Sequence, residues 1–239
     1  MNNSKKNKGS IDNNHQMKYI GRIHTDFPSK FGIPRQSGLV KSLKGIIVFE
    51  EEFRNPDALR GLKGFSHIWI IWEFSKAVRE TWSPMVKPPR LGGNTRMGVF
   101  ATRSPYRPNP IGLSSVKLDS IEIHPDLGPI LHVSGADIMD DTPIYDIKPY
   151  LSYSDCHPEA MGGYVDNLDE FQLKVNFPDH WIKLIPYDKR EALIDTLSHD
   201  PRPSYQNDSD RIYGLYFGEF DVRFTVSEDV LTVCEVVEV

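Results

Sequence analysis

One stretch decides the fold: Ser66-His67-Ile68-Trp69-Ile70-Ile71-Trp72-Glu73-Phe74. Its middle part, Ile68 to Trp72, is apolar at every position, which predicts a strand that lies inside a sheet and is covered on both faces. The run is far shorter than the ~18 apolar residues of a membrane span, so we expect no membrane segment.

Shorter strand-like stretches surround this one and are separated by turns rich in glycine and proline. We expect strands at 19–23, 45–49, 98–101, 130–133 and 145–147, and either one long strand or a strand pair at 113–124. Asn55 suits an N-cap and Pro56 a first helical position, so a short helix is expected at 55–59. This pattern favours a mainly β fold, a small antiparallel barrel that is closed or nearly closed. Because strands and helices do not alternate, a Rossmann cofactor site is not supported.

The chain of 239 residues divides into four predicted parts. Residues 1–17 are rich in Asn, Lys and Ser and predict a disordered tail, without the apolar stretch of a secretory signal. Residues 18–155 form the barrel domain, and residues 156–180 an irregular linker. Residues 181–239 predict a small α+β domain, with a helix from about Asp188 and strands at 212–217, 220–226 and 230–237.

Cysteine, histidine and charge content exclude several classes of protein. Cys156 and Cys234 are the only cysteines, too few for a disulfide scaffold or a four-cysteine zinc site, and they favour a cytoplasmic compartment. The 8 histidines lack ligand spacing, so no metal is expected. The net charge of -5 is the sum of unevenly distributed charges. Residues 79–107 form a basic block with six cations and one acid, Glu80, and residues 219–239 form an acidic block. This distribution is compatible with one confined face that binds a polyanion.

Two segments carry the residues best suited to chemistry. In Thr102–Leu113, three prolines stiffen a loop that presents Arg103, Arg107 and Asn109, either to a polar ligand or as a rigid connector. In Asp137–Tyr150, close aspartates suit a general base, acceptors for ribose hydroxyls, or simple turns; their spacing does not fit a calcium loop. His67, at the start of the central strand, reads as a core residue or as a catalyst.

Several longer motifs together resemble the TsaA-like, or TrmO, family of tRNA methyltransferases, which act on N6-threonylcarbamoyladenosine at position 37 of the anticodon loop. The motifs are Phe31-Gly32-Ile33-Pro34-Arg35-Gln36, Gly64-Phe65-Ser66-His67-Ile68-Trp69, Pro88-Pro89-Arg90-Leu91-Gly92-Gly93, Gly98-Val99-Phe100-Ala101-Thr102-Arg103-Ser104, Arg107-Pro108-Asn109-Pro110-Ile111-Gly112, Asp146-Ile147-Lys148-Pro149-Tyr150 and Asp200-Pro201-Arg202-Pro203. The resemblance covers about Tyr19 to Tyr153 and resumes in the C-terminal loop.

This resemblance implies a homodimer that binds S-adenosyl-L-methionine in a barrel unrelated to Rossmann methyltransferases, with tRNA as partner. The implied cofactor-binding residues are Pro34, Arg35, Gln36, Ser75, Lys76, Arg103, Leu113, Gly135, Ala136, Asp137, Ile138, Met139 and Asp140. Two positions depart from the family pattern. Asp141 replaces a common glycine, and Ser75 replaces a frequent histidine, which makes a backbone contact more plausible at residue 75.

The chemistry of the proposed substrates suggests roles for these residues. Asp137 and Asp140 suit ribose hydroxyls or the sulfonium, and Arg35 or Arg103 suits the cofactor carboxylate. We expect the group that removes the N6 proton among Asp146, Tyr150 and His67. The expected substrate- and RNA-binding residues are Arg90, Tyr106, Arg107, Asn109, Lys148, Arg202 and Tyr205. Two alternatives remain, namely a non-catalytic barrel that binds RNA and a methyltransferase of the same fold that acts on a small metabolite.

Overall fold

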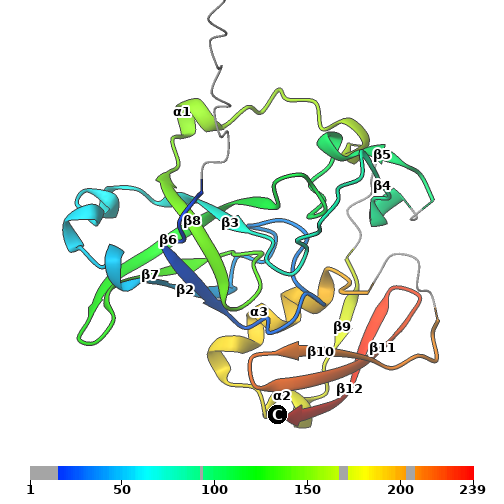
Figure 1. Ribbon diagram of the computed structural model, residues 1–239. Coiled ribbons are helices and arrows are strands. Elements are labelled where there is room, and N and C mark those ends of the chain that lie inside the picture. Colours follow the sequence, from blue (N-terminus) through cyan, green and yellow to red (C-terminus); the bar gives the residue numbers. More distant parts are fainter. Residues whose placement is uncertain (1–15, 92–93, 167–171, 203–207) are drawn as a thin grey trace, which may run out of the picture.

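The computed structural model describes residues 16–91, 94–166, 172–202 and 208–239. Most of the predicted tail 1–17 lies outside the described residues. The centre is a closed antiparallel barrel, as predicted (Figure 1). In barrel order its strands are β1 (Gly21–Thr25), β2 (Lys44–Phe49), β7 (Gly128–Ser134), β6 (Ile111–His124), β3 (His67–Glu73) and β8 (Thr142–Pro149), which pairs with β1 and closes the ring.

The predicted central strand is β3, which pairs with both β6 and β8. Ile68 and Ile70 point into the barrel and are 0% exposed, and Trp72 on the same face is nearly buried. Trp69 and Ile71 alternate with them and are partly covered on the outer face. Period-two alternation of the strand therefore separates a core face from an outer face that also carries apolar residues.

The connections differ from the prediction at one place. Val99–Ala101 does not continue a strand; it forms the 3-10 helix η5, because the amide and hydroxyl of Thr102 both donate to the Val99 carbonyl. The preceding strand β5 (Met97–Gly98) pairs only with β4 (Met85–Val86) in a two-stranded ribbon. The segment predicted as a short helix is the 3-10 helix η2 (Pro56–Leu59), and Asn55 caps it by accepting a hydrogen bond from the Asp57 amide. The remaining short helices are η1 (Glu51–Phe53), η3 (Leu62–Gly64), η4 (Pro89–Leu91), α1 (Ser152–Asp155) and η6 (Gly163–Val165).

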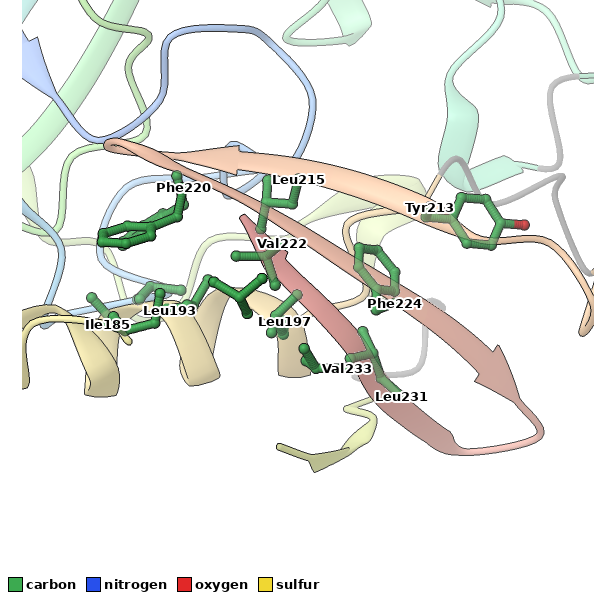
Figure 2. Packing of buried hydrophobic residues seen from close by; sticks show 14 of the residues in the cluster. Ile185, Leu193, Leu197, Tyr213, Leu215, Phe220, Val222, Phe224, Leu231 and Val233 are labelled. Atoms are coloured by element: carbon green, nitrogen blue, oxygen red, sulfur yellow. The ribbon is translucent and has the colours of Figure 1, made fainter. Parts of the chain in front are cut away.

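The C-terminal part is the expected helix-plus-sheet domain. Its elements are β9 (Lys174–Asn176), α2 (Asp179–Ile182), α3 (Tyr187–Ser198), β10 (Tyr213–Phe217), β11 (Phe220–Ser227) and β12 (Val230–Glu238). The sheet order is β10-β11-β12-β9, and β9, inside the segment 156–180 that we expected to be irregular, runs parallel to β12. Figure 2 shows Leu193 and Leu197 of α3 packed against Val222 and Phe224 of the sheet. None of the described helices has the length and apolar character needed to cross a membrane.

The loop between β1 and β2 joins the two domains. Phe27, Val40 and Leu43 are buried in the same apolar cluster as the C-terminal sheet and helix. Gly32 has φ +82° and lies so close to the sheet that an added Cβ would meet Leu215 Cδ1 at 2.1 Å. At the start of the loop, Asp26 accepts hydrogen bonds from Lys189 Nζ at 2.5 Å and from the Gly218 amide at 2.7 Å. The loop that carries Pro34, Arg35 and Gln36 thus packs against the C-terminal domain, which holds it in place.

Candidate functional site

Three segments that are far apart in the sequence meet beside β6. The Arg103 guanidinium donates a short hydrogen bond to the Gln36 side-chain oxygen. The Gly38 amide donates to the Gly135 carbonyl at 2.9 Å, and the Ser115 amide of β6 donates to Ser37 Oγ at 3.2 Å. These contacts bring together the β1–β2 loop, the stiff loop after η5 and the segment that follows β7, which carry most of the predicted cofactor residues.

Asp137 is the carboxylate at the centre of this meeting point. Its Oδ1 accepts a 2.5 Å hydrogen bond from Ser114 Oγ, which in turn accepts one from Trp72 Nε1 at 3.0 Å. Burial raises the pKa of Asp137, while the hydrogen bond from Ser114 and the charge of Arg103 act in the opposite direction. Asp137 is therefore a half-buried acceptor whose orientation is fixed by a buried serine.

The rest of the segment is tied to strand β1. Asp140 Oδ1 accepts from the Thr25 amide at 3.0 Å, and the Asp140 amide donates to the Phe27 carbonyl at 2.8 Å. Ile138 is fully buried, and its carbonyl accepts from Thr25 Oγ1 at 3.0 Å. The contacts of Asp140 therefore attach this segment to β1, whereas the Asp137 carboxylate lies beside Ser114 and Arg103.

Asp141 follows with φ +58°, a left-handed conformation that glycine adopts most easily. This is the position where the resemblance gives glycine. Arg22 Nη1 donates to the Asp141 carbonyl at 3.0 Å and holds the turn. An aspartate is tolerated in this conformation better than most side chains are.

A cavity of about 950 Å³ opens next to this cluster, and Arg35 and Arg103 line it. Its cationic lining residues are Lys30, Arg35, Arg79, Lys87, Arg103 and Arg107. Among the described lining residues, Glu80 is the one acid. Trp82, Tyr106 and Tyr164 add aromatic surface. Cations and aromatic rings around a cavity of this size suit an anionic, planar ligand.

The stiff loop shapes one wall of the cavity. Arg107 Nη1 donates to the Thr102 carbonyl at 2.9 Å, which fixes the turn of the loop. The Arg79 guanidinium lies 3.7 Å from the centre of the Tyr106 ring. The predicted residues Tyr106 and Arg107 therefore line the cavity, whereas Asn109 is exposed outside its described lining.

The sequence did not single out Arg79, Trp82 or Tyr164 as site residues, and Lys30 stood out only as part of the segment Lys30–Gly38. Arg79 belongs to the basic block, and Trp82 is a large aromatic residue within the proline-rich connection after the central strand. A tryptophan in such a connection, where no core strand or helix is expected, was a usable signal. Lys30 and Tyr164 come from separate loops, and only the folded chain brings them to the cavity.

The three candidate proton acceptors lie elsewhere. Asp146 pairs with Ile71 across β8 and β3 and forms a 2.8 Å ion pair with Lys148, on the outer face of the barrel. The rings of His67 and Tyr150 lie 6.2 Å apart at the far end of β3, and His67 is exposed. In the described part of the chain, Asp146, Tyr150 and His67 do not line the cavity. Their catalytic role stays a prediction.

Leu113, Ser75 and Lys76 also lie outside the described cavity lining. Leu113 is 57% exposed on the outer face of β6, opposite Ile71 of β3. Ser75 follows β3 in a tight turn where its amide donates to the Glu73 carbonyl at 2.9 Å.

Arg202 is 8% exposed and donates through Nε and Nη2 to the two carboxylate oxygens of Asp200, at 2.9 and 3.0 Å. These contacts make it part of the C-terminal fold, and its binding to RNA stays a prediction. Tyr205 and the side chain of Arg90 lie outside the described residues.

Residues 22–156 match the tRNA-methyltransferase O N-terminal domain, and residues 171–239 match the TrmO C-terminal domain. The chain is 40% identical over 221 residues to the tRNA (adenine(37)-N6)-methyltransferase of Escherichia coli K12, covering 89% of this chain and 94% of that protein. It is 37% identical over 159 residues to the human protein of the same name, covering 66% of this chain and 34% of that protein. The crystal structure of TrmO from Pseudomonas aeruginosa superposes with a TM-score of 0.77 at 31% identity, covering 95% of this chain and 98% of that one.

Proposed function

The chain belongs to the tRNA-methyltransferase O family, and on this premise we propose that it methylates N6 of threonylcarbamoyladenosine at position 37 of tRNA. It is a tRNA methyltransferase that depends on S-adenosylmethionine. The proposal adds the modified adenosine as the acceptor and N6-methyl-threonylcarbamoyladenosine as the product. The reaction would take place in the cytoplasm.

One observation carries the proposal: Arg103 belongs both to the cationic cavity and to the cluster around Asp137. A cavity of this charge suits an anticodon loop, because the RNA backbone is a polyanion and the modified base carries a further carboxylate. In this proposal Lys87, Arg79 and Arg107, which line the cavity, would bind these anions. An acceptor base in this cavity would lie next to the residues predicted to hold the cofactor.

The residues around Asp137 fit S-adenosylmethionine. Asp137 is a fixed acceptor for ribose hydroxyls or an ammonium group, and Arg35 and Arg103 are donors for a carboxylate. When bound, the cofactor supplies an electrophilic methyl group on a sulfonium. The N6 lone pair of the acceptor is delocalised into the urea-like group, so this chain would contribute mainly by aligning the two substrates and excluding water.

We also propose that the protein is a homodimer. The outer face of β6 exposes Leu113 at 57% and Ile111 at 36%, next to the half-covered Ile71 of β3. A second copy that covers this apolar face would also approach Asp146, which pairs with Ile71 from the other side. Light scattering on the purified protein would show a mass of twice 27.3 kDa; a mass of one chain at micromolar concentration would contradict the dimer.

The acceptor is tested with labelled S-adenosylmethionine and two tRNA preparations, one that carries threonylcarbamoyladenosine and one that lacks it. We expect label only in the modified tRNA, at N6 of residue 37. Equal labelling of both preparations would contradict the proposed acceptor. Labelling of neither, together with methylation of a small adenosine derivative, would favour a metabolite methyltransferase.

A further inference from the structure

Two exposed aromatic rings lie side by side, and one of them, that of Trp82, lines the cavity. Trp82 precedes strand β4 and Phe100 follows strand β5, so these two residues lie at the open end of the two-stranded ribbon, whose strands are labelled in Figure 1. The ring centres are 6.0 Å apart, with 33° between the ring planes.

Both rings expose much of their apolar surface to solvent. Trp82 is 51% exposed and Phe100 72% exposed, although they are packed against each other. Exposed apolar surface of this kind is unfavourable in water, and it commonly marks a binding surface when it adjoins a charged site. The cationic residues of the cavity provide such a site.

The backbone that carries the rings is held in place. Ser83 Oγ donates to the Met85 carbonyl at 2.8 Å, next to Trp82. Val99, next to Phe100, is 1% exposed, and its amide donates to the Pro84 carbonyl at 2.9 Å. Both rings therefore project from anchored backbone, so little conformational freedom would be lost when a ligand packs on them.

The neighbouring aromatic residue Tyr106 is used differently. The guanidinium of Arg79 covers one face of its ring at 3.7 Å, a contact that orients the arginine in the cavity wall. Tyr106 is thus partly occupied within the protein. Trp82 and Phe100, in contrast, contact each other and expose the rest of their surfaces.

We infer that Trp82 and Phe100 form a stacking platform for unpaired bases of the RNA loop that enters the cavity. Unpaired bases stack on aromatic side chains regardless of sequence, and nearby cations neutralise the backbone that carries them. Complementary charge favours RNA as the occupant, since the adjoining cavity is lined by six cations and one described acid. The identity of this RNA as an anticodon loop rests on the proposed function.

The test compares two RNA probes, an anticodon stem-loop and a blunt duplex without unpaired bases. Trp82→Ala or Phe100→Ala should raise the Kd for the stem-loop by roughly 5- to 150-fold, the range expected from losing about 1–3 kcal/mol of base stacking. The Kd for the duplex should change little, and Phe100→Tyr, which keeps the ring, should restore stem-loop binding. Tyr216→Ala is the matched control, since Tyr216 is a 46% exposed aromatic residue on the C-terminal sheet.

Three measurements complete the test. An unchanged Kd for the stem-loop in both alanine variants would overturn the platform. Analytical ultracentrifugation measures whether the alanine variants still have the mass of the wild type. If they bind RNA weakly only because two copies of the chain have separated, the platform is overturned as well. Binding is measured without S-adenosylmethionine and methyl transfer separately, so a protein that binds the loop through both rings but transfers no methyl group would refute the proposed function alone.

Discussion

Ser114 shows how one buried hydroxyl sets up the site. It is 1% exposed and bridges Trp72 Nε1 and Asp137 Oδ1. Ser114→Ala would leave the indole N–H without its partner and release the carboxylate, so we expect a loss of about 1–3 kcal/mol in the free energy of unfolding. The affinity for S-adenosylmethionine should fall as well. Urea unfolding and calorimetry measure the two effects.

Ser42→Ala is the control for this variant. The Ser42 hydroxyl is also buried, but within the described residues it has no hydrogen-bond partner. Its removal should cost little stability and leave cofactor affinity unchanged. Equal losses in the two variants would show that the contacts of Ser114 do not matter.

The shifted pKa of Asp137 predicts a pH dependence of stability. Burial raises this pKa above the ordinary 3.8, so the folded state holds its proton to a higher pH than the unfolded state does. Between the two pKa values the folded state binds more protons, and stability falls as pH rises. The wild type should therefore lose stability relative to Asp137→Asn as pH rises from about 3.8. Urea curves that shift in parallel at every pH would contradict this.

At the residue scale, the sequence predicted chemistry better than it predicted contacts. The resemblance gives a glycine at the position of Asp141, and the structure has a φ of +58° there. The sequence named Asp137 and Asp140 as candidates for binding the cofactor and Arg202 as a candidate for binding RNA. Only the folded chain shows that Asp140 is bonded to Thr25 and Arg202 to Asp200. Such partners are set by tertiary packing, which leaves no local signal.

At the element scale, the β1–β2 loop was expected as a loop, but its contacts with the C-terminal domain were not. Glycines and prolines predicted a loop, and a loop is observed. Its role in joining the domains was not predictable, because Phe27 and Gly32 meet partners in β10 that lie almost 200 residues further along the chain. The strand expected at 98–101 likewise included residues that form η5, because Gly98-Val99-Phe100-Ala101 fits a strand and a 3-10 helix equally well as a local sequence.

Two glycines of this loop provide a matched pair of variants. Both have a positive φ, +82° at Gly32 and +76° at Gly38. A Cβ at Gly32 would collide with the fully buried Leu215, whereas a Cβ at Gly38 would have nothing within 4 Å. Gly38→Ala should cost about 1–2 kcal/mol of backbone strain. Gly32→Ala should cost about 1–3 kcal/mol more, because the core cannot accept the added methyl group without shifting.

This pair also tests whether the C-terminal domain supports the cofactor residues. The displacement in Gly32→Ala should weaken S-adenosylmethionine binding, because Arg35 and Gln36 follow directly. The double variant Gly32→Ala with Leu215→Ala should recover part of that affinity, since the space opposite residue 32 is restored. Unchanged cofactor affinity in Gly32→Ala would show that the packing of the β1–β2 loop on the C-terminal domain does not position the cofactor residues.

At the scale of the whole molecule, the net charge of -5 says little about function. The cavity gathers cations from the β1–β2 loop, the connection after β3 and the loop after η5, while the acidic residues 219–239 belong to the C-terminal sheet. The sequence revealed the basic block but not the cavity, because Lys30 and Tyr164 reach it from distant segments. Folding thus gathers positive charge at the cavity, although the net charge of the whole chain is negative.

This concentration predicts a specific dependence on salt. If Lys87 contacts a phosphate of the RNA, Lys87→Ala should weaken binding and lower the slope of log K against log salt by about 0.7, the value for one contact to a single strand. Lys183→Ala removes the same charge from the exposed C-cap of α2, outside the described cavity lining, and should leave the slope unchanged. Anisotropy titrations of the stem-loop at several potassium chloride concentrations measure both slopes. Equal slopes for Lys87→Ala, Lys183→Ala and the wild type would mean that Lys87 contacts no phosphate and that the RNA backbone does not follow this wall of the cavity.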